Sequence, residues 1–293
     1  MSMMSKLKLF KYLILILLLS QSKIFPQENS PLYAVAVSYT PVLNTSDYEM
    51  VFGGSDGGQV KLDDQGLIRE MEFIAFPNTV FEIIESIPKE DHSILKVTTS
   101  DYPYESSDLF IDSRFVEVVN TKPTERSKVL PDKNEILINI LNLDGRPYMW
   151  GGNYDAGIEA LLNYYSPSVE IDNNVKSNWC LKGVDCSGLI YQATGGATPR
   201  NTSSLIKYGT GLLIEGKSTE EIAEMLLPLD LITWSGHVII IVNDSTVIES
   251  SPPEGVHKSE LISRLNEVMS ERTPVNDWSA TEGKRFVIRR WAE

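Results

Sequence analysis

The run Val184-Asp185-Cys186-Ser187-Gly188 decides which fold this sequence indicates. Cys186 stands at the start of a stretch, 187–194, that can form a helix, and the following Gly195-Gly196 can end it. The unpaired N–H groups and the dipole at a helix start favour a thiolate, so the position suits a nucleophile. A lone cysteine in such a place is more often a buried structural residue, and the hypothesis therefore depends on partners elsewhere in the chain.

The first partner is His237, in the run Ser-Gly-His-Val-Ile-Ile-Ile-Val over 235–242. The apolar residues predict a strand, which would hold His237 at the mouth of a rigid sheet, as suits a general base. Residues 246–250 predict the second strand of a hairpin. Glu249 on that strand could lie beside the imidazole, hold its tautomer and stabilise the imidazolium. An exposed strand carboxylate is the plain alternative for Glu249.

Four ordered elements resemble the NlpC family of papain-like cysteine peptidases, over roughly residues 130–293. They are Arg146-Pro147-Tyr148-Met149-Trp150-Gly151-Gly152, Asp185-Cys186-Ser187-Gly188, Pro228-Leu229-Asp230-Leu231 and Gly236-His237-Val238. The resemblance implies a papain-like domain in which a helix bearing the nucleophile packs on an antiparallel sheet, although the local papain signature C-G-S-C-W is absent. It implies Cys186 as the nucleophile and His237 as the base, with Glu249 where the family often has a histidine.

The same resemblance implies a substrate site without a metal ion or a cofactor. Its predicted substrate-binding residues are Tyr148, Trp150, Asp185, Ser187 and Asn201. Relatives that cut short cell-wall peptides often carry an aspartate where this chain has Asn201, and the amide weakens any ionic contact with a substrate amine. A long segment inserted between Gly152 and Asp185 is rich in aromatic residues, which predicts packing, with a wall of the cleft as one role.

Residues 29–120 are predicted to be all β. The β-rich runs are 34–39, 60–62, 79–84, 93–98, 110–111 and 115–119, separated by Gly, Pro, Asn and Asp. Strands this short and this closely spaced predict a small barrel, and the segment resembles the bacterial SH3-like domains of cell-wall enzymes. Residues 121–131 are predicted to be a linker and 132–293 the peptidase domain, which opens with a helix over 132–143 capped by Asp132. The predicted fold class is α+β.

Residues 1–28 are predicted to be a cleaved signal peptide. Lys6, Lys8 and Lys11 precede the apolar run Tyr12-Leu13-Ile14-Leu15-Ile16-Leu17-Leu18-Leu19. That run is shorter than the about 20 residues of a membrane span. A retained anchor is the alternative, but we expect a periplasmic or secreted monomer without stable membrane insertion. Cys180 and Cys186 are the only cysteines, so no disulfide framework is expected. A bridge between them would block the nucleophile, and we therefore expect free thiols.

Composition narrows the class of partner. The formal net charge is −14 at pH 7, and a surface of this sign repels phosphate backbones, so nucleic acid is not an expected partner. Hydrophobic residues make up 42% of the chain, which is enough for a sizeable core. The expected partners are therefore peptides derived from peptidoglycan, as the resemblance implies.

The resemblance also implies a reaction, hydrolysis of the γ-D-glutamyl bond to a diamino acid, diaminopimelate or lysine, in peptidoglycan stem peptides. In similar two-domain enzymes the SH3-like domain narrows the cleft and selects a free N-terminal L-Ala, so short released peptides are the expected substrates. Two alternatives stay open: another amidase or acyltransferase reaction on the same scaffold, and a catalytically silent protein that binds the cell wall.

Overall fold

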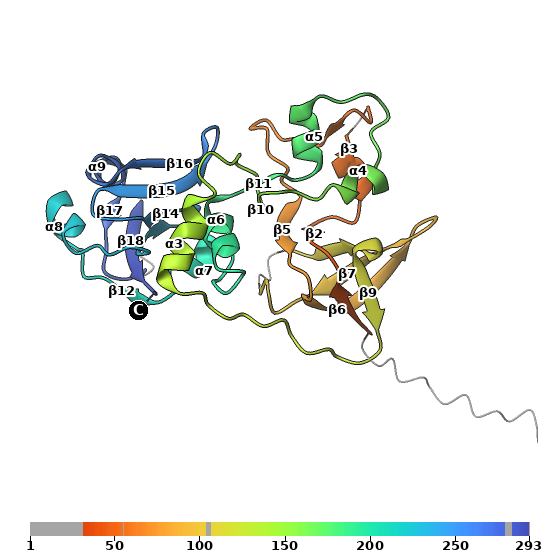
Figure 1. The fold of residues 1–293 in the computed structure, drawn as a ribbon, viewed down its shortest axis with the longest axis horizontal. Coiled ribbons are helices and arrows are strands. Elements are labelled where there is room, and N and C mark those ends of the chain that lie inside the picture. Colours follow the sequence, from red (N-terminus) through yellow and green to blue (C-terminus); the bar gives the residue numbers. More distant parts are fainter. Residues whose placement is uncertain (1–31, 55, 104–106, 279–282, 293) are drawn as a thin grey trace, which may run out of the picture. The chain divides into compact units, whose positions relative to one another are not determined.

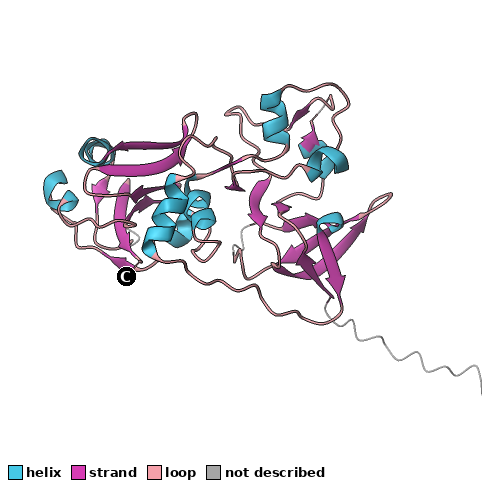
Figure 2. Cartoon of the chain, viewed as in Figure 1, coloured by secondary structure: helices cyan, strands magenta, loops and turns pink. Residues whose placement is uncertain are grey.

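The structure is a computed structural model that describes residues 32–54, 56–103, 107–278 and 283–292. The predicted signal peptide lies outside these residues. The described chain combines helices with antiparallel sheets, which is the predicted α+β class (Figure 2). Among the helices described, none has the length and apolar character needed to cross a bilayer.

The N-terminal part is built on one seven-stranded antiparallel sheet, shown in orange to yellow in Figure 1. Its strands, in spatial order, are β5 (Met71–Ala75), β2 (Thr40–Leu43), β8 (Leu109–Asp112), β7 (Ser93–Thr98), β6 (Val80–Pro88), β1 (Leu32–Ala36) and β9 (Val116–Val119). A short helix α2 (Tyr48–Val51), the ribbon β3 (Phe52–Gly53) with β4 (Gln59–Val60), and the 3-10 turn η1 (Ser113–Phe115) complete it. Its assignment to the SH3-like class stays a prediction.

The insertion 153–184 forms β10 (Asn153–Tyr154), α4 (Ala160–Tyr164), α5 (Asn173–Trp179) and β11 (Gly183–Val184). Its large side chains do pack, but against the N-terminal sheet. Leu161, Tyr165 and Trp179 share one buried cluster with Phe52 and Met71. The insertion therefore joins the two halves of the molecule through a common apolar core.

The C-terminal part is built on a second seven-stranded sheet. Six strands follow the order β12 (Thr210–Gly211), β18 (Arg285–Arg290), β13 (Leu231–Trp234), β14 (His237–Ile241), β15 (Thr246–Ser251) and β16 (Gly255–Glu260), and β17 (Thr273–Pro274) pairs with β18. Helices α3 (Lys133–Leu141), α6 (Cys186–Ala193), α7 (Thr202–Leu205), α8 (Thr219–Ala223) and α9 (Leu261–Glu271) surround it.

Alternating side chains of β14 enter two separate cores, as the period of two in a strand requires. Val238 and Ile240 pack in the core formed with α3 and α6. Ile239 and Ile241 pack in the core that contains Leu261 and Leu265 of α9. The uninterrupted apolar run after His237 is thus explained by burial on both faces, and it anchors the strand that carries this histidine.

Several local predictions need correction. Helix α3 begins after Asp132, whose side chain caps Asn134 and Glu135, but Leu141 is 38% exposed and does not belong to the buried face. The strands β2 and β5 and the helix α9 were not predicted. The side chain of His92, although it stands in a polar turn of the sequence, is only 6% exposed.

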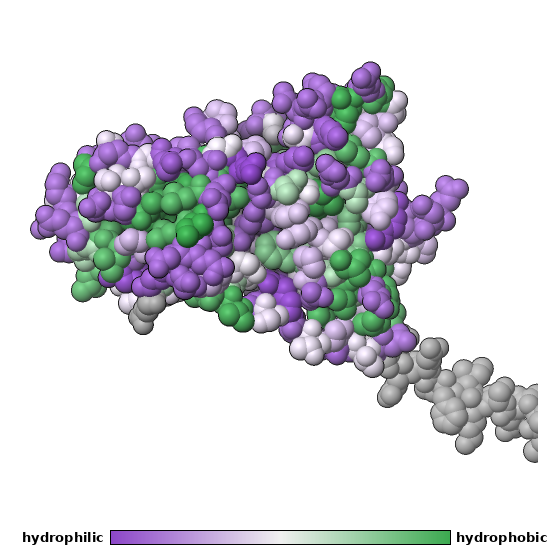
Figure 3. All heavy atoms as spheres, in the orientation of Figure 1, coloured by the Kyte–Doolittle hydropathy of each residue, from purple (hydrophilic) through white to green (hydrophobic). Residues whose placement is uncertain are grey.

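The segment 121–131 runs along the molecule as an extended chain, but it is fixed in its middle by Arg126. The guanidinium of Arg126 bonds to Asp101 in the N-terminal part, at 2.5 Å. It also donates to the carbonyl oxygens of Gly195 and Gly196 and to the hydroxyl of Tyr191 in the C-terminal part. One buried arginine therefore ties the segment to both halves. Polar residues cover most of the surface in Figure 3, in keeping with the acidic composition.

Candidate active site

Cys186 is the first residue of α6, and Asp185 caps that helix. The Asp185 carboxylate accepts hydrogen bonds from the amide of Gly188 at 2.7 Å and from the hydroxyl of Ser187 at 3.0 Å. It also accepts from the amide of Gly151, at 3.1 Å, in the loop that carries Tyr148. The cap therefore fixes the start of the helix and holds the Tyr148 loop beside it.

Arg200 completes this cap, and sequence reasoning did not identify it. Its side chain is 1% exposed, and its Nη2 lies 2.5 Å from Asp185 Oδ2. Its Nη1 bonds to Ser187 Oγ, while its Nε is buried without a hydrogen-bond partner among the described residues. The charge of Asp185 is thus compensated inside the protein. Asp185 and Ser187, predicted to bind substrate, form most of their hydrogen bonds with the helix start and with Arg200.

His237, Glu249 and Arg264 form a second buried network. The hairpin of β14 and β15 places Glu249 Oε2 2.5 Å from His237 Nε2. Arg264 of α9 donates two hydrogen bonds to the same carboxylate, from Nε to Oε1 at 2.6 Å and from Nη2 to Oε2 at 3.0 Å. Burial alone would raise the pKa of Glu249, but the hydrogen bonds from His237 and Arg264 outweigh it and lower that pKa to about 2. Glu249 is therefore ionised at neutral pH.

The sulfur of Cys186 lies against the backbone on both sides of His237. It is 4.0 Å from the carbonyl oxygen of Gly236, and it accepts from the amide of Val238. Glu249 occupies Nε2 of the imidazole, so Nδ1 is the ring nitrogen outside this pairing. The sequence prediction of a depressed thiol pKa is wrong: burial, with a smaller contribution from Asp185, raises the pKa of Cys186 to about 12. Cys180 is also a free, buried thiol.

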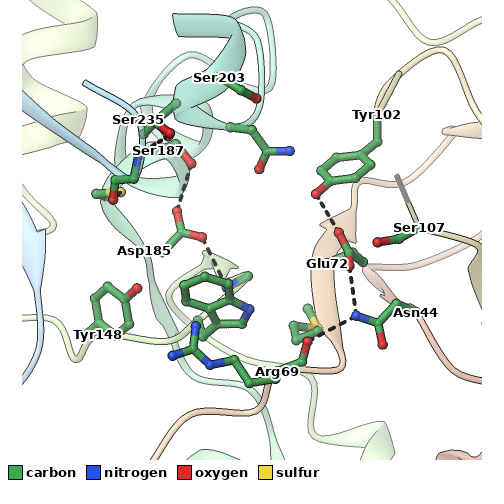
Figure 4. Close-up of a pocket in the computed structure, with 17 residues that line it drawn as sticks. Asn44, Arg69, Glu72, Tyr102, Ser107, Tyr148, Asp185, Ser187, Ser203 and Ser235 are labelled. Atoms are coloured by element: carbon green, nitrogen blue, oxygen red, sulfur yellow. Dashed lines mark hydrogen bonds between the residues drawn. The ribbon is translucent and has the colours of Figure 1, made fainter. Parts of the chain in front are cut away.

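A cavity of about 450 Å³ opens over Cys186, and its two walls come from the two halves of the molecule (Figure 4). The C-terminal wall contains all the predicted substrate-binding residues: Tyr148, Trp150, Asp185, Ser187 and Asn201. Their role in binding stays a prediction. His237 and Glu249 lie behind this wall and do not line the cavity. No residue of the insertion 153–184, which is described throughout, lines it either, so the predicted cleft wall is corrected.

The N-terminal wall is centred on Glu72 of β5, which sequence reasoning also missed. Its two carboxylate oxygens accept from the amide of Asn44 at 2.9 Å and from the hydroxyl of Tyr102 at 2.7 Å (Figure 4). Asn201 of the other wall also bonds to Tyr102, so a polar chain crosses the cavity. Both of these donors are neutral: Asn44 offers an amide, and burial raises the pKa of Tyr102 well above its ordinary value, so its hydroxyl stays protonated. In the described chain, no lysine or arginine forms an ion pair with Glu72.

Two aromatic residues frame the remaining cavity. The guanidinium of Arg69 stacks on Trp150, 4.2 Å from the ring centroid, and pairs with Asp63 on its outer side. Burial, followed by the charges of Asp185 and Cys186, raises the pKa of Tyr148 well above its ordinary value. Its hydroxyl therefore stays protonated and able to donate a hydrogen bond. Among the described residues, no cluster of three or more His, Cys, Asp or Glu side chains is arranged to hold a metal ion.

Neither a family model nor a curated protein sequence matches this chain. Several solved structures of NlpC/P60 proteins are similar to it at low scores. An NlpC/P60 family protein from Bacillus cereus aligns with 92% of this chain at 14% identity and a TM-score of 0.34. This chain spans 66% of that protein's length.

Two further NlpC structures cover most of their own length. RipD from Mycobacterium tuberculosis, described as a non-catalytic NlpC/p60 domain protein adapted to peptidoglycan binding, aligns over 95% of its length and 54% of this chain, at 18% identity and a TM-score of 0.32. NlpC2 from Trichomonas vaginalis aligns over 97% of its length and 89% of this chain, at 10% identity and a TM-score of 0.35. The structural neighbours are thus NlpC/P60 proteins, and scores this low carry no activity over to this chain.

Proposed function

We propose that this protein is an exported cysteine peptidase of the NlpC type that cleaves short peptidoglycan stem peptides at the γ-D-glutamyl bond to the diamino acid. One observation carries the proposal: a single cavity has the thiol of Cys186 on one wall and the carboxylate of Glu72 on the other. A peptide bound across it would present an amide to the sulfur and a free amine to the carboxylate. We further propose that the N-terminal sheet is the SH3-like domain of such enzymes.

The chemistry begins with a protonated thiol at Cys186. Since burial keeps Cys186 protonated, His237 takes its proton through Nδ1 as the sulfur attacks the amide carbon. The imidazolium that forms is stabilised by Glu249. The oxyanion would accept from the backbone amide of Cys186 at the helix start and from the hydroxyl of Tyr148.

Collapse of the tetrahedral intermediate breaks the carbon–nitrogen bond, and His237 returns the proton to the leaving amine. The acyl group stays on the sulfur of Cys186 as a thioester. His237 then removes a proton from water, whose oxygen attacks the thioester carbon, and the thiol is regenerated. The products are a free γ-carboxylate and a free diamino acid, so the reaction balances without a cofactor.

Glu72 accounts for the preference for short peptides. Among the described residues the donors to its carboxylate are neutral, so an ammonium group would supply a cationic partner. The N-terminal amine of L-Ala lies two residues from the scissile bond of a stem tripeptide. A stem peptide still attached to its sugar has an amide in place of this amine, and it would leave Glu72 without a cation.

The test is release of diaminopimelate from L-Ala-γ-D-Glu-diaminopimelate by the wild-type protein and by Cys186→Ala. We expect release by the wild type and none by the variant, with slower release from the N-acetylated tripeptide. Equal release by both proteins contradicts Cys186 as the nucleophile.

The two alternatives have outcomes of their own in the same experiment. Cleavage of a different amide, or transfer of the acyl group to an added amine, would identify another reaction on the same scaffold. Binding of the tripeptide by both proteins without any turnover would make this protein a silent binder. Cys180→Ser is the matched control, because this buried thiol lies outside the cavity and the substitution should leave turnover unchanged.

A further inference from the structure

Helix α9 carries a charged group into the back of the catalytic network. Arg264 and Glu249 are joined by two short hydrogen bonds, and the Glu249 side chain is 1% exposed. A second carboxylate, that of Glu267, holds Arg264 from outside at 3.0 Å. The resulting chain of hydrogen bonds runs from His237 through Glu249 to Arg264 at the protein surface, and Cys186 lies against the backbone beside His237.

We infer that Arg264 is a positioning residue that keeps His237 available as a neutral base by compensating the charge of Glu249. This inference rests on the proposed peptidase function. A buried carboxylate 2.5 Å from an imidazole strongly favours the imidazolium, which cannot accept the thiol proton. A bidentate guanidinium on the same carboxylate offsets that attraction while it holds both oxygens in place.

The burial of Cys186 makes this compensation necessary. With the thiol pKa raised by burial, the resting site holds a protonated thiol at Cys186. The active form therefore requires His237 to have lost its own proton before the substrate arrives. Without Arg264, the charge of Glu249 would hold the proton on His237 up to a higher pH. The acidic limb of the activity profile would then move to higher pH as well.

Other charged and titratable groups face this network from each element packed against it. On β16, His257 is the direct cross-strand neighbour of Glu249, and its Nδ1 lies 3.0 Å from the carbonyl oxygen of Gly255. His257 is half-buried within β16. Arg272, beyond α9, stacks on Trp234, which packs against His237. The remaining charged groups are Asp185 beside Cys186, and Glu254 and Glu267 around the outer cavity that exposes Arg264.

The effect of Arg264 can be measured without any peptide. We would follow alkylation of Cys186 by iodoacetamide against pH, with mass spectrometry to separate it from Cys180. In Arg264→Gln we expect the acidic limb of the rate profile to move upward by about one pH unit. Arg264→Lys keeps the positive charge but loses the bidentate contact of the guanidinium. The acidic limb of its alkylation profile should therefore stay near the wild-type position. Glu267→Gln, which removes only the outer partner, is the matched control and should also keep it.

Any contribution of His257 to the pH profile is removed by comparing the proteins with and without Arg264→Gln in a His257→Gln background. Only three histidines exist in the chain, so NMR of their ring protons can follow His237 directly. An upward shift that persists in this background supports Arg264, while superimposable profiles of wild type and Arg264→Gln overturn the inference. If Arg264→Gln does not fold, a limb in Arg264→Lys that moves upward as far as one pH unit would also overturn it.

The same experiment separates this inference from the proposed function. Failure of the tripeptide assay together with the expected alkylation shift would reject the substrate and keep the role of Arg264. Cleavage of the tripeptide with unchanged alkylation profiles would reject Arg264 and keep the peptidase.

Discussion

The two sides of the cavity differ in whether their carboxylates have cationic partners. On the C-terminal side, Asp185 of the wall is paired with Arg200, and Glu249 behind the wall is paired with Arg264. On the N-terminal side, the donors to Glu72 in the described chain are the neutral groups of Asn44 and Tyr102. A charge that is already compensated positions other groups, whereas a charge that still lacks a cation is suited to bind one. In the proposed reaction, the wall that contains Cys186 thus supplies fixed geometry, and the opposite wall supplies recognition.

The largest expected effect comes from opening the Asp185–Arg200 pair. Arg200→Met leaves a buried carboxylate without its cation, which costs roughly 3–5 kcal/mol of unfolding free energy. Urea denaturation followed by fluorescence measures it. The double variant Asp185→Asn/Arg200→Met should recover part of the loss, and a single variant within 1 kcal/mol of wild type would show that this wall does not depend on the pair.

Removing the second oxyanion donor should change turnover but not stability. Tyr148→Phe deletes one hydroxyl, and we expect kcat on the tripeptide to fall about 100- to 1,000-fold, with little change in KM. Tyr208→Phe, far from the cavity and packed on Trp291, is the matched control. An unchanged kcat would mean that Tyr148 does not donate to the oxyanion and that backbone amides alone stabilise it.

A change on the opposite wall should affect KM instead. Glu72→Gln keeps the shape and removes the charge, so KM for the free tripeptide should rise roughly 10- to 100-fold while kcat changes little. The N-acetylated tripeptide should be insensitive to the substitution. Glu85→Gln, on the exposed strand β6, is the matched control. A loss of kcat without a rise in KM would contradict the division between the two walls.

The smallest effect is expected at the contact between the walls. Asn201→Asp adds a carboxylate beside Tyr102, close to the proposed amine site, and should lower KM for the free tripeptide a few-fold. Asn201 has a positive φ of 77°, which asparagine tolerates better than most residues, so unfolding curves must accompany the kinetics. A KM that rises in a fully folded variant would argue against an amine at this position.

What the sequence could predict was local. The spacing of His237 and Glu249 on two strands around a tight turn was sufficient to place the two side chains together, because hairpin register follows from turn length. The helix starting at Cys186 was likewise readable from its neighbours. Helix α9 was missed, although Leu261, Leu265 and Val268 recur at helical spacing, and Arg264 was missed with it.

What the sequence could not predict depends on segments distant in the chain. Glu72 meets the site through a sheet more than a hundred residues before Cys186. Arg200 lies in an irregular loop whose path gives no periodic signal. The predicted direction of the pKa shift of Cys186 was wrong for a related reason. The helix start favours a thiolate, but the burial that raises this pKa depends on the whole surrounding fold.

The insertion and Arg126 together have a consequence for how this protein can be divided. Trp179 is completely buried in a cluster that also contains Phe52 and Met71, and Arg126 bonds to both halves. Excision of residues 132–293 would expose that cluster to water, so the C-terminal half is not an exchangeable module. Heating should unfold both sheets in one cooperative transition, and a graft onto another N-terminal domain would need a surface matched to Trp179.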